Sequence, residues 1–123
     1  RERVEFLSYV YWRGEIAQRF AHALAEKARE GVAVRVLLDA FGAAPMARSL
    51  ISTMEDGGVI LRWFRPLKRF RLWRDLRRTH RKVLVADGEV GFTGGVGIAT
   101  EWCGDARDHT EWRDTHFRIV GPA

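Results

Sequence analysis

Cysteine is scarce in this sequence, and long apolar runs and internal repeats are missing. The 123 residues include one cysteine, Cys103, and a single thiol cannot form an internal disulfide. That composition is typical of a reducing compartment and excludes a small disulfide-stapled domain. No run of about 18 apolar residues occurs, so the sequence predicts no membrane-spanning helix. What remains is a chain long enough to bury one hydrophobic core, which predicts a single domain over residues 1–123.

Positive charge is concentrated in one segment. The net charge is +5, but residues 62–82 hold ten Lys or Arg and one acid, Asp75, whereas the rest of the chain holds eleven basic and fifteen acidic residues. The chain is therefore mildly acidic apart from one strongly basic stretch. Such a stretch predicts an anionic partner, namely phosphate, nucleic acid or an acidic lipid surface.

Strand and helix patterns alternate along the first half. Residues 4–12 are rich in β-branched and aromatic side chains and predict a strand that ends before Gly14. Apolar residues at helical spacing predict a helix over 15–31, and the apolar run 32–40 predicts a second strand that is covered on both faces. A strand, a helix and a strand in so short a stretch form a βαβ unit, which predicts parallel strands.

The second half continues this alternation and then forms a hairpin. Pro45 stands where a helix would begin and run to Gly58, and a strand follows over 59–64. Residues 80–86 and 90–94 predict a hairpin around Asp87-Gly88, a dipeptide that accepts the positive φ of a type I′ turn. A last strand is predicted over residues 114–120. Together these elements predict an α/β fold with a central mixed β-sheet flanked by helices.

The segment HRKVLVADGEVGFTGG carries the candidate chemistry. Because residues two apart in a strand face the same side, His80 and Lys82 are expected to project together. This pair suits phosphoryl transfer, since the imidazole can attack phosphorus while the ammonium neutralises the non-bridging oxygens. Thr93, Gly94 and Gly95 end the paired strand, where glycines let backbone N–H groups approach an oxyanion. The His and Lys spacing, taken alone, is also typical of a strand face in water.

The longer spacing resembles the H-x-K-x4-D-x6-G-G/S signature of the phospholipase D superfamily. The match comprises His80, Lys82, Asp87 and the pair Gly94-Gly95. The stretches YVYWRGEIAQRFAHALAEKAREG, GVAVRVLLDAFGA and EWRDTHFRIVGPA resemble the bacterial cardiolipin synthase branch, so the resemblance covers essentially the whole chain. It implies a mechanism without metal or cofactor. In that mechanism His80 attacks a phosphodiester to form a covalent phosphohistidine, and Lys82 holds the phosphate.

Two aspartates are candidate catalytic residues. Asp87 matches the aspartate of the motif, although its position at the hairpin tip favours a turn role. Asp114 is the better candidate for a carboxylate that hydrogen-bonds the His80 ring and fixes its tautomer, because some superfamily members place an acid near this position. The alternative for Asp114 is a surface aspartate at the end of a strand.

Two features depart from the superfamily pattern. The family often has asparagine two residues after the glycine pair, where this sequence has Gly97. Superfamily members also work with two motifs that meet at a pseudo-two-fold axis, and neither His22, His109 nor His116 begins a second H-x-K. The chain is therefore expected either to be one half of a two-motif enzyme, the N-terminal one, or to pair with a copy of itself. Its ends look cut, which favours the first alternative.

The basic stretch provides the candidate binding surface. It interleaves aromatics with arginines and leads directly into His80, so it is placed to line an active site. The residues expected to meet anionic phospholipid headgroups at a membrane surface are Arg69, Phe70, Arg71, Trp73, Arg77 and Arg78. The alternative is a solvated loop whose aromatics enter the core.

Three functions are consistent with these features. The first is a phospholipase D-type phosphatidyltransferase that acts on a phosphatidylglycerol-like lipid at the cytoplasmic face of the bacterial inner membrane. The second is a phosphodiesterase or nuclease of the same superfamily, whose basic stretch binds a nucleic-acid backbone. The third is a catalytically silent lipid- or nucleic-acid-binding module, because a second motif is absent. The stretch WRDTHFRIVGPA favours the first function over the second.

Overall fold

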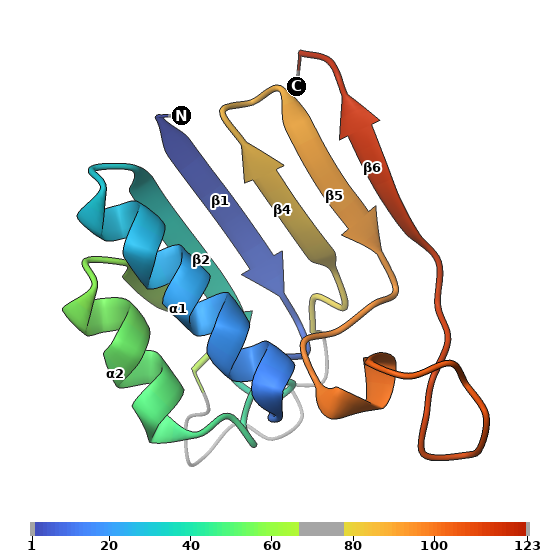
Figure 1. Cartoon of the computed structure of the whole chain (residues 1–123). Helices are drawn as coiled ribbons and strands as arrows, with labels where there is room; N and C mark the ends of the chain where they lie inside the picture. The colour runs from blue at the N-terminus through green and yellow to red at the C-terminus, as the bar shows by residue number, and fades with distance from the viewer. Residues whose placement is uncertain (1, 67–77, 123) are drawn as a thin grey trace.

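Three parallel strands and two helices form the first half of the chain (Figure 1). The computed structural model describes residues 2–66 and 78–122. β1 (Arg3–Ser8), α1 (Glu15–Arg29), β2 (Ala33–Asp39), α2 (Arg48–Asp56) and β3 (Ile60–Phe64) follow one another, and β2 pairs in parallel with both β1 and β3. The predicted βαβ unit and its parallel strands are confirmed.

Antiparallel strands complete the sheet on the other side of β1. β4 (Lys82–Ala86) pairs with β1, β5 (Val90–Gly94) with β4, and β6 (His116–Val120) with β5. The six strands lie in the order β3-β2-β1-β4-β5-β6, and a 3-10 helix, η1 (Thr100–Trp102), lies between β5 and β6 in the chain. The prediction of an α/β fold with a central mixed sheet and flanking helices is confirmed.

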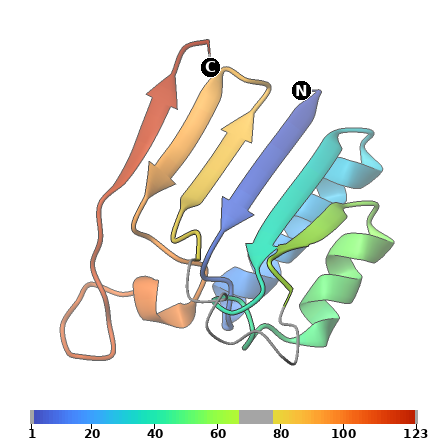
Figure 2. The ribbon, with the colours of Figure 1, turned by 180° about the vertical axis from the view of Figure 1, so that it is seen from behind.

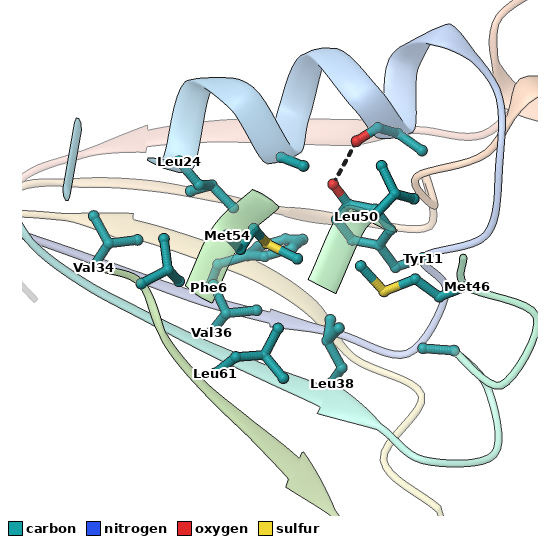
Figure 3. Packing of buried hydrophobic residues seen from close by; sticks show 14 residues of the cluster. Phe6, Tyr11, Leu24, Val34, Val36, Leu38, Met46, Leu50, Met54 and Leu61 are labelled. Atoms are coloured by element: carbon teal, nitrogen blue, oxygen red, sulfur yellow. Dashed lines mark hydrogen bonds between the residues drawn. The ribbon is translucent and has the colours of Figure 1, made fainter. Parts of the chain in front are cut away.

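Both helices pack on one face of the sheet, over β1 to β3 (Figures 1 and 2). The core lies between the helices and the sheet. It includes Phe6, Val36 and Leu38 from the sheet and Leu24 and Met54 from the helices (Figure 3). In β2 the buried residues alternate with the exposed ones over its first four positions. The prediction that this strand is covered on both faces is therefore wrong for the part of the chain that the structure describes.

Several predicted elements are shorter than the sequence indicated; the strands predicted over 80–86 and 114–120, for example, begin at Lys82 and His116. The strand predicted over 4–12 ends at Ser8. The chain then turns away from β2 and β4, because Tyr11 is fully buried and forms a bridge with Ile98. The helix predicted from Pro45 begins at Arg48 instead. The reason is a chain of turn hydrogen bonds from Asp39 to Met46, which holds this segment out of the helix.

The β4–β5 hairpin has a three-residue loop, residues 87–89, with Ala86 paired to Val90. Asp87 and Gly88 have φ angles of 58° and 71°, so both have the positive φ that the sequence indicated. The loop agrees with the predicted strand bounds, 80–86 and 90–94, and is one residue longer than a two-residue type I′ turn. A shift of one residue in pairing moves every side chain of β5 to the opposite face of the sheet.

Candidate active site

His80 and Lys82 lie together at the edge of the sheet where β1 and β5 end and β4 and β6 begin (Figure 1). Lys82 is the first residue of β4, and its Nζ lies 3.2 Å from Nδ1 of His80. The Tyr9 ring packs against the His80 ring, with 4.5 Å between the ring centroids. The Lys82 Nζ lies over the Tyr9 ring, 5.9 Å from its centroid. The backbone N–H of Tyr9 donates to the carbonyl of Arg81, which holds this aromatic contact in place. The structure thus brings the two expected side chains together, although the strand predicted over 80–86 begins at Lys82 and His80 lies just before it.

The two side chains differ in their burial. Lys82 is 5% exposed, whereas His80 is exposed. Burial lowers the pKa of Lys82, and the negative charge of Asp114 partly opposes this effect. A buried ammonium with few polar neighbours favours an anion that enters beside it, because the anion restores part of the lost solvation.

Asp114 lies on the other side of the same pocket, over the backbone of Gly95. The pocket has a volume of about 520 Å³ and is lined by His80, Lys82, Gly95 and Asp114 among others. A Cβ on Gly95 would overlap the Asp114 carboxylate, so this position requires glycine. The glycine is therefore needed for close packing of a carboxylate, whereas the sequence indicated a role in phosphate binding.

Asp114 does not make the contact that the sequence predicted. Its Oδ1 accepts a hydrogen bond from the backbone N–H of Thr115 at 2.7 Å. Within the described residues, no hydrogen bond joins it to His80, whose Nδ1 faces Lys82 instead. In this structure Asp114 acts on the pair through the electrostatic attraction that raises the pKa of Lys82.

The three residues expected to bind phosphate are placed differently from the expectation. Thr93 pairs with Val83, so its side chain lies on the opposite face from Lys82, and its hydroxyl donates to the Lys82 carbonyl at 3.0 Å. Gly94 and Gly95 line the pocket. The N–H of Gly95, however, donates to the Thr115 carbonyl at 3.1 Å. Thr93 is therefore a structural residue, and the Gly95 N–H is already engaged.

Asp87 lies at the opposite end of β4 from His80. Its Oδ1 accepts hydrogen bonds from the backbone N–H groups of Glu2 and Arg3, at 2.8 and 2.9 Å. Its own N–H donates to the Arg3 carbonyl. The structure therefore does not bring Asp87 into the pocket, and the turn role that its position favoured is the one its contacts support.

Arg78 faces inward, against the expectation that it lies on a lipid-binding surface. Its side chain is 8% exposed, and Nη1 lies 3.7 Å from Oδ1 of the fully buried Asp39. Nη1 also donates to the Arg65 carbonyl at 2.8 Å, and the guanidinium lies over the Phe41 ring. Arg78 thus tethers the segment that leads into His80. The other residues expected on the lipid-binding surface lie outside the described residues: Arg69, Phe70, Arg71, Trp73 and Arg77.

Aromatic side chains of this pocket were not predicted from the sequence. Besides the charged groups, the pocket is lined by Tyr9, Trp12, Trp102 and Trp112. They come from the loop after β1, from η1 and from the loop before β6, so no local periodicity links them. The sequence signal was the number of tryptophans, five in 123 residues, of which Trp12 precedes the motif and Trp102 and Trp112 follow it.

Neither a metal site nor a membrane-spanning helix occurs in the part of the chain that the structure describes. In residues 2–66 and 78–122, no three His, Cys, Asp or Glu side chains lie close enough together to hold a metal ion. Among the same residues, no helix has the length and apolar character needed to cross a membrane.

A mixed β-sheet with two helices on one face, and a buried lysine beside an exposed histidine at the start of β4, is the arrangement that the phospholipase D resemblance implied. Residues 1–107 match the family model described as "Cardiolipin synthase, PLD-like domain", and the chain belongs to this family. The resemblance noted from the motif is thereby confirmed.

Similar proteins include cardiolipin synthases and two solved structures. The chain is 34% identical to cardiolipin synthase 1 of Bacillus cereus and 35% identical to the cardiolipin synthase of Listeria innocua, in both cases over its whole length. It spans 24% and 26% of those proteins, about a quarter of their length.

The structural comparisons bear on the fold. Nuc of Salmonella typhimurium, a phospholipase D family member, matches with a TM-score of 0.60 at 17% identity, covering 97% of this chain and 66% of Nuc. Polyphosphate kinase of Porphyromonas gingivalis matches with a TM-score of 0.58 at 15% identity, covering 97% of this chain and 18% of the kinase.

Proposed function

We propose that this chain is the part of a phospholipase D-type phosphatidyltransferase that carries the nucleophilic histidine. The observation that supports this most directly is the distance of 3.2 Å between Lys82 Nζ and His80 Nδ1 in a pocket that also contains Asp114. An ammonium and an imidazole so close together can contact one phosphate group. The cardiolipin synthase relatives support an anionic, phosphatidylglycerol-like lipid as the diester.

The proposed reaction begins when the phosphate enters and Lys82 moves its hydrogen bond from His80 Nδ1 to a non-bridging oxygen. Nδ1 can then carry the ring proton, which leaves the Nε2 lone pair free to attack phosphorus. An N–P bond forms, the P–O bond to the leaving alcohol breaks, and that alcohol takes up a proton. A second alcohol then attacks the phosphohistidine: a new P–O bond forms, the N–P bond to His80 breaks, and the alcohol's proton goes to the group that protonated the leaving alcohol. The scheme uses no metal or cofactor.

The proton for the leaving alcohol needs a second acid. We infer that a second motif supplies it, either from another part of a longer chain or from a homodimer mate. The relatives are about four times as long as this chain, which supports the first arrangement. A phospholipid substrate would place the protein at a membrane surface, and the cytoplasmic face of the bacterial inner membrane is the location we propose.

Trapping of the covalent intermediate tests this function. The full-length protein is incubated with ³²P-labelled phosphatidylglycerol in vesicles and quenched. We expect label on the protein with the native residues and with His22→Ala, a control at an exposed helical histidine. With His80→Ala the label should disappear, and turnover should fall by about a thousandfold or more.

Other outcomes would contradict the proposal. Retention of label in His80→Ala would show that another residue is the nucleophile. Cleavage of a labelled oligonucleotide in place of the lipid would identify the nuclease alternative. Binding of lipid without label or turnover would identify a silent binding module.

A further inference from the structure

Three tryptophans form a wall of the pocket that contains His80 and Lys82, and the reaction proposed above leaves them without a role. Trp12 follows β1, Trp102 ends η1 and Trp112 precedes β6. Their ring centroids lie 4.8, 5.8 and 6.2 Å apart, with interplanar angles of 87°, 53° and 79°. Two of the three pairs have the edge-to-face packing that aromatic rings prefer, and the Trp12–Trp102 pair is tilted.

The wall is available to a ligand. None of the three tryptophans is among the buried core residues of the described chain, and Trp112 is 43% exposed. A cluster of large aromatic side chains outside the core, next to a charged site, marks a binding surface more often than a stability element.

Hydrogen bonds hold the rings in place before any ligand arrives. Trp12 Nε1 donates to the Gly42 carbonyl at 2.6 Å. The backbone N–H of Trp112 donates to the Glu101 carbonyl at 2.6 Å, and its Nε1 donates to the His109 carbonyl at 3.3 Å. A ligand that packs on pre-positioned rings loses less conformational entropy than one that must order them.

Gly97 makes room for this wall. A Cβ at this position would lie 2.8 Å from Cβ of Val10 and 3.0 Å from Cζ3 of Trp102. Any larger residue would therefore displace the Trp102 ring from its place beside Val10. The glycine that departs from the motif thus has a steric reason in this structure.

We propose that Trp112, supported by Trp102 and Trp12, is the subsite for the apolar part of the substrate: the glycerol carbons and first acyl methylenes beside the reacting phosphate. This inference rests on the proposed function, because it assigns the substrate class of the same pocket. Indole faces carry negative potential and disfavour an anion, so the phosphate goes to Lys82 and the carbon skeleton to the indoles. A stacked nucleic-acid base needs a free ring face. In the two edge-to-face pairs of the wall, part of a ring face is taken up by a neighbouring indole, which favours an aliphatic ligand over a stacked base.

The test measures binding of three monomeric phosphodiesters to the full-length protein by calorimetry. They are dihexanoyl-phosphatidylglycerol, glycerophosphoglycerol and a thymidine dinucleotide, which share the phosphate and differ in the group beside it. His80→Ala is used as the background, so that turnover does not interfere. We expect the acylated diester to bind more tightly than glycerophosphoglycerol.

Trp112→Ala should reduce this preference about tenfold, equivalent to about 1.4 kcal/mol. Trp112→Phe should keep most of it, because an aromatic face remains. Phe117→Ala is the matched control, an aromatic that is 58% exposed and lies on the opposite face of the sheet from Lys82. It should leave the preference unchanged. Because the preference is a ratio within one variant, a loss of folded protein cancels.

Equal weakening of all three diesters in Trp112→Ala would overturn the subsite, and so would a preference for the dinucleotide. Failure of the proposed function looks different: the acyl preference would be present, yet the protein with His80 intact would turn over no lipid. Turnover without an acyl preference would support the proposed function and contradict the proposed subsite.

Discussion

Under the proposed function, Lys82 is a residue at which phosphate binding and stability oppose each other. Its ammonium is buried beside His80, and burial lowers its pKa below the ordinary value of 10.5. Replacement by Met keeps most of the side-chain volume and removes the buried charge. We expect Lys82→Met to abolish phosphate binding and to raise the free energy of unfolding by about 1 kcal/mol. Urea denaturation and phosphate titration measure the two effects, and a loss of stability would show that the ammonium supports the fold.

The lowered pKa also predicts a pH dependence of stability. Between the folded-state pKa of Lys82 and its ordinary value of 10.5, the unfolded chain binds more protons than the folded one. The free energy of unfolding should therefore rise with pH in this window, and below it the contribution is constant. Lys82→Met should lack this rise when the two proteins are compared by urea denaturation from neutral pH to pH 10.5.

Asp87 should affect stability and leave catalysis unchanged, although the motif includes it. Asp87→Ala removes two hydrogen bonds to the start of β1 and places alanine at a φ of 58°. We expect a loss of about 1 to 2 kcal/mol in the free energy of unfolding. Asp87→Asn keeps an acceptor oxygen and should lose less. Turnover per folded molecule should equal that of the native protein in both variants. A lower turnover would show that Asp87 contributes to catalysis.

Thr93 shows how far the sequence predicts the candidate site. Strand alternation predicted that His80 and Lys82 lie together, and they do, although only Lys82 is in β4 and His80 precedes it. The side that Thr93 faces depends on the hairpin register. A two-residue loop would pair it with Lys82, whereas the observed loop of residues 87–89 pairs it with Val83. The face that Thr93 occupies therefore depends on one residue of loop length, which the Asp87-Gly88 dipeptide alone does not fix.

At the scale of elements, Asp39 connects the end of β2 to the segment before β4. Its Oδ1 accepts from the N–H groups of Phe41 and Gly42, at 2.9 and 3.0 Å, and it faces Arg78 at 3.7 Å. Asp39→Ala leaves the buried guanidinium without this carboxylate and should lower the free energy of unfolding by about 3 kcal/mol. Asp39→Asn keeps an oxygen for the two N–H groups and should lose an intermediate amount.

Glu5→Gln provides the matched control for the Asp39 variants. Glu5 pairs with Arg35 at 3.6 Å on an exposed part of the sheet, where an ion pair contributes at most about 1 kcal/mol. Denaturation curves of the three variants give the comparison. Equal losses for Asp39→Ala and Glu5→Gln would mean that the buried pair does not hold the two segments together.

The order and type of the elements could be predicted from the sequence, but their ends could not. Strand and helix periods are local properties, and each predicted element is present. The ends depend on contacts between distant residues. Residues 9–12 look like a continuing strand, yet the Tyr11–Ile98 bridge draws them away from β1. The same distant contacts assemble the tryptophan wall, so no local pattern indicated it.

At the scale of the whole molecule, one face of the sheet is open. Among the described residues, no helix packs on the face opposite α1 and α2 (Figure 2). A hollow of about 560 Å³ on this face is lined by Leu7, Leu37 and Val83 among others. Ile119, which is 58% exposed, extends the apolar surface onto β6. Apolar surface gathered on one face marks a region that another chain or domain covers.

A chain of residues 1–123 alone should therefore self-associate, and the open face should cause it. Ile119 and Val120 are neighbours in β6 and are 58% and 64% exposed, but they project to opposite faces because side chains alternate along a strand. Ile119→Lys should shift the association to higher protein concentration, since it places a charge on the open face, whereas Val120→Lys should have little effect. Sedimentation velocity over a concentration series compares the two variants. Equal effects would indicate association through the exposed backbone edge of β6, which both lysines would disturb alike, and a chain that stays monomeric would show that the open face is tolerated in water.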